Sequence, residues 1–140
     1  MKKILIAIAL AFLAVGLFFT VKDLRADPLN DDLVVKDEDY WTQMWCYETN
    51  PFEVRGDNEV ILEDRGRIDC VIDEFVIEFD WPYKYQEAIG QCLRYSLRTG
   101  KRPGIVLLMR SAKDEKYWKS LQAVILKFNL PIQTWKMKTY

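Results

Sequence analysis

An uninterrupted apolar run, GIVLLM at residues 104–109, places the strongest constraint on the fold of this chain. A strand that is apolar on both faces belongs at the centre of a sheet that is covered on both sides. Residues 84–100 and 115–129 flank this run, and their apolar positions repeat at helical spacing. Gly100 and Pro103 mark the end of the first helix. The pattern predicts an α/β fold with a central mixed sheet flanked by helices.

The other segments complete the order of elements. Residues 37–48 have apolar and aromatic positions at helical spacing, which predicts a short amphipathic helix. Alternating or apolar segments predict further strands at residues 53–56, 59–64, 66–72, 75–81 and 131–137, the first two as a hairpin that turns at residues 56–58. The predicted order is helix, a meander of three or four strands, helix, strand, helix, strand.

The amino-terminal segment predicts export. Lysines precede an apolar run from Ile4 to Phe19, and charged residues follow it. Residues 1–26 are therefore either a signal peptide, cleaved after small residues near Gly16 or Ala26, or a retained membrane anchor through residues 4–21. A buried core helix is the remaining alternative. Both of the first two interpretations place the domain outside the cytoplasm, as a periplasmic, secreted or anchored protein.

The rest of the chain is long enough for one domain only. We expect residues 27–37 to be a linker and residues 38–140 to form the domain. Its charge is divided: residues 27–93 carry 18 acidic and 5 basic side chains, whereas residues 94–140 carry 2 acidic and 11 basic ones. Such asymmetry indicates an anionic partner, or else the two halves neutralise each other across the fold.

Three acidic residues interrupt the apolar pattern of RIDCVIDEFVIEFDW, residues 67–81. If the strands fold back about residues 73–74, Asp69 lies opposite Glu78, and Asp80 follows two residues along the same strand. A three-residue loop would shift this pairing by one. The opposite face is then the core face, with Ile68, Cys70, Ile72, Phe75, Ile77 and Phe79.

Carboxylates this close repel each other unless a cation lies between them. Oxygen ligands suit Mg²⁺ or Mn²⁺, whereas zinc prefers His and Cys. The alternative is a solvated sheet face on which Arg67 pairs with Asp80. Because the chain has no histidine, catalysis by Ser-His-Asp or Cys-His is excluded, and metal-assisted hydrolysis is the simplest enzymatic interpretation. We expect no organic cofactor.

The next helix adds candidate groups. Lys84, Gln91 and Tyr95 are seven and four residues apart, so they share one stripe of the helix that begins just after Asp80. A lysine in the first turn can lean back over the carboxylates, where it would orient water or neutralise a phosphate. The alternative for each is structural: an exposed lysine, a surface amide and a residue at the rim of the core.

At this point the chain resembles the PD-(D/E)xK nuclease superfamily. The helix, three-stranded meander, helix and strand are in that order, with Asp69 on the second strand and Glu78 on the third. The segment Gln91-Cys-Leu-Arg-Tyr95 resembles the Gln-x-x-x-Tyr signature of the RecB-like branch. The likeness covers most of residues 38–110, and the run YQEAIGQCLRYSLRTGKRPGIVLL is similar to small exported bacterial or phage-associated members.

The resemblance implies a restriction-endonuclease-like core and metal-dependent hydrolysis of nucleic acid. We expect DNA in preference to RNA as the partner, and the motifs leave both open. Asp69 and Glu78 match the metal ligands of the family. The chain departs from the pattern at Glu78-Phe79-Asp80, where the family has Glu-x-Lys. Either Lys84 supplies the lysine, with Asp80 as a further ligand or as its partner, or catalysis is lost and a binding module remains. Glu38 on the first helix is the candidate for an additional acid.

A nuclease site requires a basic rim that holds phosphates. The basic residues at the end of the second helix are candidates, and Trp81, with Tyr83, is positioned to stack on an unpaired base or to pack at the helix entrance. The predicted nucleic-acid contacts are Arg94, Arg98, Lys101, Arg102 and Trp81.

Three cysteines in an exported domain leave one unpaired. Cys46 ends the first helix and Cys70 lies on the core face of a strand, so we expect a disulfide between them. Cys92 is then a buried free thiol. In a cytoplasmic chain all three would be small core residues.

Overall fold

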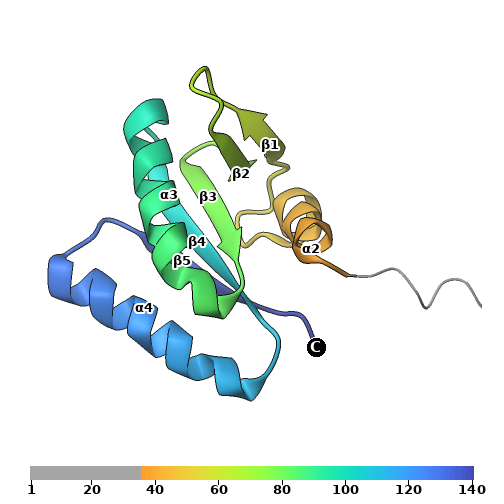
Figure 1. Ribbon diagram of the computed structural model, residues 1–140. Coiled ribbons are helices and arrows are strands. Elements are labelled where there is room, and N and C mark those ends of the chain that lie inside the picture. The colour runs from red at the N-terminus through yellow and green to blue at the C-terminus, as the bar shows by residue number, and fades with distance from the viewer. Residues whose placement is uncertain (1–35) are drawn as a thin grey trace, which may run out of the picture. The chain divides into compact units, whose positions relative to one another are not determined.

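A computed structural model describes residues 36–140 of the chain. Five strands form one sheet in the order β1-β2-β3-β4-β5, with helices on its faces (Figure 1). The strands are β1 (Asp57–Ile61), β2 (Arg67–Val71), β3 (Phe75–Asp80), β4 (Arg102–Met109) and β5 (Gln133–Lys138). The helices are α2 (Glu38–Met44), continued by the π-helical turn η1 (Trp45–Thr49), then α3 (Tyr85–Thr99) and α4 (Glu115–Phe128), with short 3₁₀ turns η2 (Pro82–Lys84) and η3 (Ala112–Asp114).

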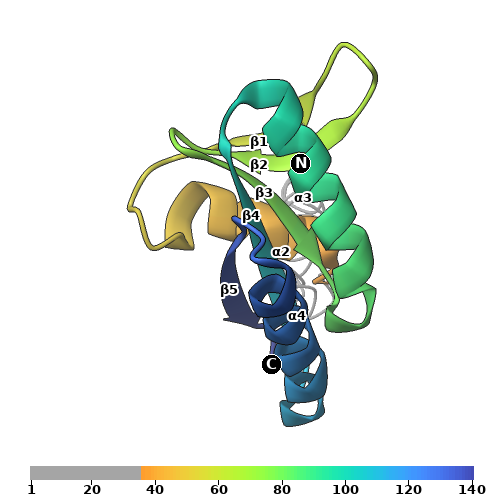
Figure 2. The same cartoon turned by 90° about the vertical axis from the view of Figure 1, so that its left-hand side faces the viewer.

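The sheet is mixed, as the sequence predicts. Strands β1, β2 and β3 form an antiparallel meander, and β3, β4 and β5 are parallel. Parallel neighbours need crossover connections, and α3 and α4 provide them. Both of these helices cover one face of the sheet, whereas α2 lies against the other (Figures 1 and 2). The general α/β class and the order of the elements are therefore confirmed.

The core lies on both faces of β3 and β4, because every residue of β3 and every residue of β4 after Arg102 is buried. On the α2 face, Phe75, Ile77 and Phe79 pack with Trp45. On the α3 and α4 face, one cluster contains Ala88, Cys92, Ile105, Leu107 and Leu121. The prediction that residues 104–109 form a strand covered on both sides is confirmed.

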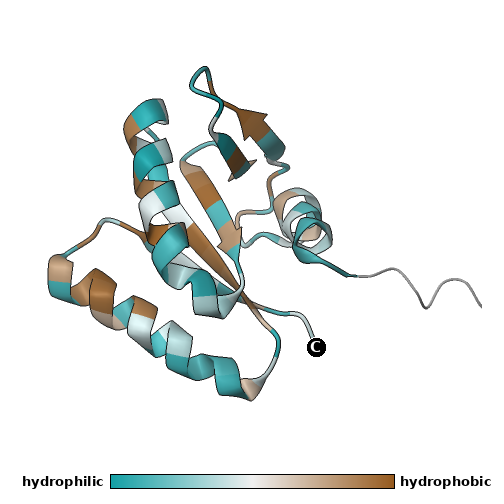
Figure 3. Cartoon of the chain, viewed as in Figure 1, coloured by the Kyte–Doolittle hydropathy of each residue, from teal (hydrophilic) through white to brown (hydrophobic). Residues whose placement is uncertain are grey.

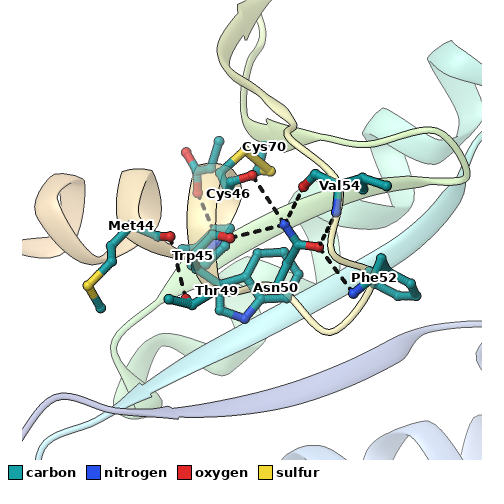
Figure 4. Close-up of a disulfide and its surroundings, with 10 residues drawn as sticks. Met44, Trp45, Cys46, Thr49, Asn50, Phe52, Val54 and Cys70 are labelled. Atoms are coloured by element: carbon teal, nitrogen blue, oxygen red, sulfur yellow. Dashed lines mark hydrogen bonds between the residues drawn. A yellow bond between two sulfur atoms is a disulfide. The ribbon is translucent and has the colours of Figure 1, made fainter.

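A disulfide joins Cys46 in η1 to Cys70 on β2, with 5.9 Å between the Cα atoms (Figure 4). Beside it the buried Asn50 side-chain amide donates to the carbonyl oxygen of Val54 at 2.6 Å and lies 3.3 Å from that of Cys46. The contact with Cys46 satisfies a carbonyl group at the end of the helix, and the contact with Val54 ties the following loop to it. The predicted bridge is thus present, and Cys92, the remaining cysteine of the described range, is buried and free.

The predicted hairpin of residues 53–56 and 59–64 is wrong. Residues 53–56 form no strand, and β1 begins at Asp57, inside the expected turn, and pairs with β2 instead. Gly56 is not a turn residue, because a Cβ atom there would lie 2.6 Å from the Cys46 sulfur and its N–H donates to the Cys46 carbonyl at 2.9 Å. The close approach to the disulfide, rather than a turn, requires glycine here.

The predicted signal peptide or anchor and all but the end of the linker lie outside the described residues. Within residues 36–140, no helix combines the length and apolar character needed to cross a membrane. The disulfide is compatible with an extracellular location, since such bonds persist in oxidising compartments.

Candidate active site

The hairpin of β2 and β3 places the three acidic residues. Ile72 and Phe75 exchange backbone hydrogen bonds of 3.0 and 3.3 Å across a two-residue turn, and Cys70 pairs with Ile77. The predicted fold-back about residues 73–74 is therefore confirmed. This register brings Asp69 to the level of Glu78 on the neighbouring strand.

The ladder between β2 and β3 ends at Cys70, and the Asp69 side chain replaces the next backbone acceptor. Asp69 Oδ2 accepts a hydrogen bond from the Phe79 N–H at 2.9 Å. Ile68 packs with Val76 and Tyr95 instead of joining Cys70 on the α2 face. The prediction of one continuous core face including Ile68 is wrong, because a side-chain hydrogen bond interrupts the alternation.

Glu78 is buried beneath α3, with 3% of its surface exposed. Strand β3 is largely apolar but carries a hydrophilic part (Figure 3), and its two acidic residues are Glu78 and Asp80. Burial, and then the neighbouring Asp69, raise the pKa of Glu78 to about 9. Its Oε1 atom accepts no hydrogen bond from any residue of the described range. A buried carboxyl oxygen without a partner is costly, so this atom indicates an unfilled requirement for a proton or a cation.

Asp80 and Lys84 form an ion pair across the start of α3. Lys84 Nζ lies 3.6 Å from Asp80 Oδ1, and the aspartate side chain is nearly buried. Burial and the negative charge of Glu38 raise the pKa of Asp80 to about 7, while Lys84 opposes this shift. Asp80 in turn raises the pKa of Lys84. The pair holds the lysine at the end of β3 that also carries Glu78.

Glu38 joins this group from the first turn of α2. Burial raises its pKa, Lys84 lowers it, and the nearby Asp69 raises it further. The candidate acid of the first helix is therefore electrostatically coupled to Asp69, Asp80 and Lys84. The pairing of Arg67 with Asp80, expected for a solvated face, is wrong, because Arg67 pairs with Glu59 at 3.0 Å.

The stripe of α3 that faces the sheet differs from the prediction at one position. Tyr95 is buried, and burial followed by Glu78 raises its pKa. Gln91 is exposed, and Cys92 occupies the buried position beside Glu78 instead, where burial raises the pKa of the thiol to about 12. A spacing of 3.6 residues per turn allows either position, and the preference of a thiol for the interior decides between them.

The basic residues of the predicted rim have partners within the fold. Arg94 and Arg98 lie 2.8 and 3.5 Å from Asp64. Arg102 lies opposite Phe75 in the ladder between β4 and β3, and its guanidinium lies 3.4 Å from the Glu74 carboxylate. Lys101 Nζ donates to the carbonyl oxygens of Ile72 and Asp73 at 3.2 and 2.6 Å.

A different arginine, Arg110, contacts the residue that follows Asp80, and the sequence did not predict it. The Arg110 guanidinium stacks over the Trp81 ring at 4.8 Å. Arg110 follows β4 directly, and the carboxyl ends of parallel strands are where ligands bind in open α/β sheets. The place of Arg110 directly after the predicted central strand was therefore the sequence feature that could have identified it.

The acidic side chains can be compared with the ligands that a bound metal ion needs. Among residues 36–140, no three or more His, Cys, Asp or Glu side chains are arranged as a ready metal cage. Mg²⁺, however, is commonly held by one or two carboxylates, with water and substrate phosphate completing its shell. Asp69 and the unpartnered Oε1 of Glu78 are such donors, so the chemistry of the residues fits a hard divalent cation.

Comparison with protein-family models, curated proteins and solved structures finds no match to this chain. Membership of the PD-(D/E)xK superfamily therefore stays a prediction that rests on the quoted motifs.

Proposed function

We propose that this protein is a metal-dependent hydrolase of phosphodiester bonds in nucleic acid, built on a restriction-endonuclease-like core. The observation that carries the proposal is the buried Glu78, whose Oε1 has no hydrogen-bond partner in the described part of the chain and whose charge is coupled to Asp69 and Asp80. A cation would remove both the repulsion and the unsatisfied oxygen.

In this proposal Asp69 and Glu78 hold Mg²⁺ or Mn²⁺. When bound, the ion would polarise the phosphodiester group and lower the pKa of a water molecule. The hydrogen bond from Phe79 N–H fixes one oxygen of Asp69, so the other remains available. Glu38 is the candidate for a further contact, because it lies within the electrostatic reach of Asp69 and Asp80.

Lys84 takes the role of the family's lysine from the next structural element. Its charge would neutralise negative charge that develops on the phosphate. Asp80, at the usual lysine position, holds Lys84 Nζ at 3.6 Å and so positions it. The proposal also includes roles for Gln91 and Tyr95 in the reaction. It further includes contacts of four basic residues with nucleic acid: Arg94, Arg98, Lys101 and Arg102.

A second candidate function is supported by the same ion pair. Because an aspartate stands where the family has lysine, the domain would have lost catalysis and would bind nucleic acid, a cation or a protein through this face. This module and the hydrolase share the exported location that we propose from residues 1–26 and the disulfide.

The test is cleavage of labelled single-stranded and double-stranded DNA and RNA by the full chain in detergent, titrated with Mn²⁺ or Mg²⁺. Glu78→Gln removes the charge with little change in shape, and the exposed Glu63→Gln is the matched control. We expect metal-dependent cleavage that Glu78→Gln abolishes and Glu63→Gln retains. If the folded protein cleaves none of the substrates, the hydrolase is refuted and the binding module is favoured.

A further inference from the structure

Arg110 lies at the carboxyl end of β4 and stacks on two aromatic rings that follow β3. Its guanidinium is 4.8 Å from the centre of the Trp81 ring and 5.7 Å from that of Tyr83. Trp81 is half-buried and packs against the core, whereas Tyr83 is 48% exposed. The three side chains thus form a platform with one fixed ring, one accessible ring and a positive charge.

The charge of this platform is not neutralised within the fold. None of the ion pairs formed by residues 36–140 includes Arg110. By contrast, each of the arginines at the other end of α3 and β4 has a carboxylate within 3.5 Å. Cation–π stacking orients a guanidinium group while leaving its N–H donors free for an anion.

The platform adjoins the acidic site through the chain itself. Trp81 follows Asp80, and its N–H donates to Asp80 Oδ1 at 3.2 Å. Tyr83 precedes Lys84, the partner of that aspartate. Strands β3 and β4 are parallel, and their carboxyl ends lie at the same edge of the sheet (Figure 1). Arg110 directly follows β4 and Trp81 directly follows β3, so both residues lie at this edge. A ligand bound on the platform would therefore lie next to the ion pair of Asp80 and Lys84.

We infer that Arg110, Trp81 and Tyr83 form a subsite for one unpaired nucleotide of a single-stranded nucleic acid, with the phosphate on Arg110 and the base on the exposed face of Tyr83. The inference rests on the proposed function and names its substrate class. Bases within a duplex already stack on their neighbours, whereas those of a single strand are free to stack on aromatic side chains. The subsite therefore selects single strands or frayed ends over blunt duplex.

The experiment measures binding of fluorescein-labelled oligonucleotides to the full chain in detergent, with EDTA present so that metal-dependent cleavage does not occur. The probes are a 12-nucleotide single strand of DNA, its RNA counterpart and a blunt 12-base-pair duplex. The variants are Arg110→Gln, Arg110→Lys and Tyr83→Ala. Arg55→Gln is the matched control, because Arg55 also stacks on a tyrosine, Tyr47 at 4.4 Å, but precedes β1.

We expect Arg110→Gln and Tyr83→Ala each to weaken binding of a single strand by about tenfold and to change duplex binding little. Arg110→Gln should also reduce the slope of log affinity against log salt by about 0.7, the loss of one phosphate contact, while Arg110→Lys should retain that slope. Arg55→Gln should match the unaltered chain. Since Tyr83 is exposed, its variant tests the subsite without disturbing the core.

Single-strand affinity in Arg110→Gln and Tyr83→Ala equal to that of the unaltered chain, or the same loss on single strand and duplex, would overturn the subsite. Cleavage that needs Glu78, together with unchanged binding by the Arg110 variant, would refute the subsite and leave the hydrolase standing. Weakened single-strand binding in a protein that never cleaves would support the subsite and refute the hydrolase.

Discussion

Lys84 Nζ and Asp80 Oδ1 lie 3.6 Å apart, so the lysine is held at the end of the strand that carries Glu78. If this lysine acts on the phosphate, Lys84→Ala should reduce cleavage by about 10²- to 10³-fold, the usual cost of removing one positioned electrostatic group. Metal affinity, measured by titration with Mn²⁺, should change little, because the proposed ligands are Asp69 and Glu78.

The exposed Lys119→Ala on α4 is the control and should cleave normally. Asp80→Asn offers a second arm: it frees the lysine from its partner, so cleavage should fall by less than in Lys84→Ala. Undiminished cleavage by Lys84→Ala would show that the lysine has no part in the reaction.

The buried carboxyl of Glu78 predicts a stability that falls with rising pH in the metal-free protein. Its pKa is raised from 4.5 to about 9, so the folded protein retains a proton that the unfolded chain releases above pH 4.5. The free energy of unfolding should therefore decrease between about pH 4.5 and 9. The groups that influence Glu78 or are influenced by it are Asp69, Asp80, Arg67, Cys92 and Tyr95.

The measurement is urea unfolding in EDTA at pH 5, 7 and 9 for the unaltered chain, Glu78→Gln and the control Glu63→Gln. Glu78→Gln should flatten the dependence, leaving the smaller fall due to Asp80, whose pKa is raised to about 7. Mn²⁺ should restore stability at high pH, since it binds the ionised carboxylates. Identical slopes in Glu78→Gln and the control would contradict the assignment.

Local alternation was sufficient to predict the hairpin of β2 and β3 and the level at which Asp69 meets Glu78. Both strands are short, their turn contains two residues, and the core demands that apolar side chains face inward. The same reasoning gave the central strand at residues 104–109 and the end of α3 at Gly100, which has a left-handed conformation at φ 72°.

The features that the sequence did not predict depend on contacts between distant residues. Ile68 changes face because Asp69 bonds to the Phe79 N–H, ten residues away. Arg94 reaches Asp64, thirty residues away, which no periodicity encodes. Gly56 looked like a turn residue, yet it is fixed by a disulfide whose cysteines lie ten residues before it and fourteen after it.

The disulfide should contribute much of the stability of this small domain. Cys46 and Cys70 are separated by 24 residues, and closing a loop of that length stabilises the fold by about 3 kcal/mol. A reductant should lower the free energy of urea unfolding of the unaltered chain by that amount. The double variant Cys46→Ala and Cys70→Ala should be less stable at the outset and insensitive to reductant. An unfolding midpoint that reductant leaves in place would contradict this role.

Two glycines should respond to the same substitution in opposite ways. An alanine Cβ at Gly56 would lie 2.6 Å from the Cys46 sulfur and 2.9 Å from the Cys70 sulfur, whereas one at Gly90, within α3, would meet nothing within 4 Å. Overpacking should make Gly56→Ala less stable by about 1–3 kcal/mol. Gly90→Ala should be more stable by about 0.5–1 kcal/mol, because alanine restricts the unfolded chain and favours helix.

Urea unfolding of both variants with and without reductant measures these changes. The penalty at Gly56 should shrink when the disulfide opens, because the sulfur atoms can then move apart. The gain at Gly90 should not change. A penalty at Gly56 that is independent of reductant would place its cause in the backbone rather than in the disulfide.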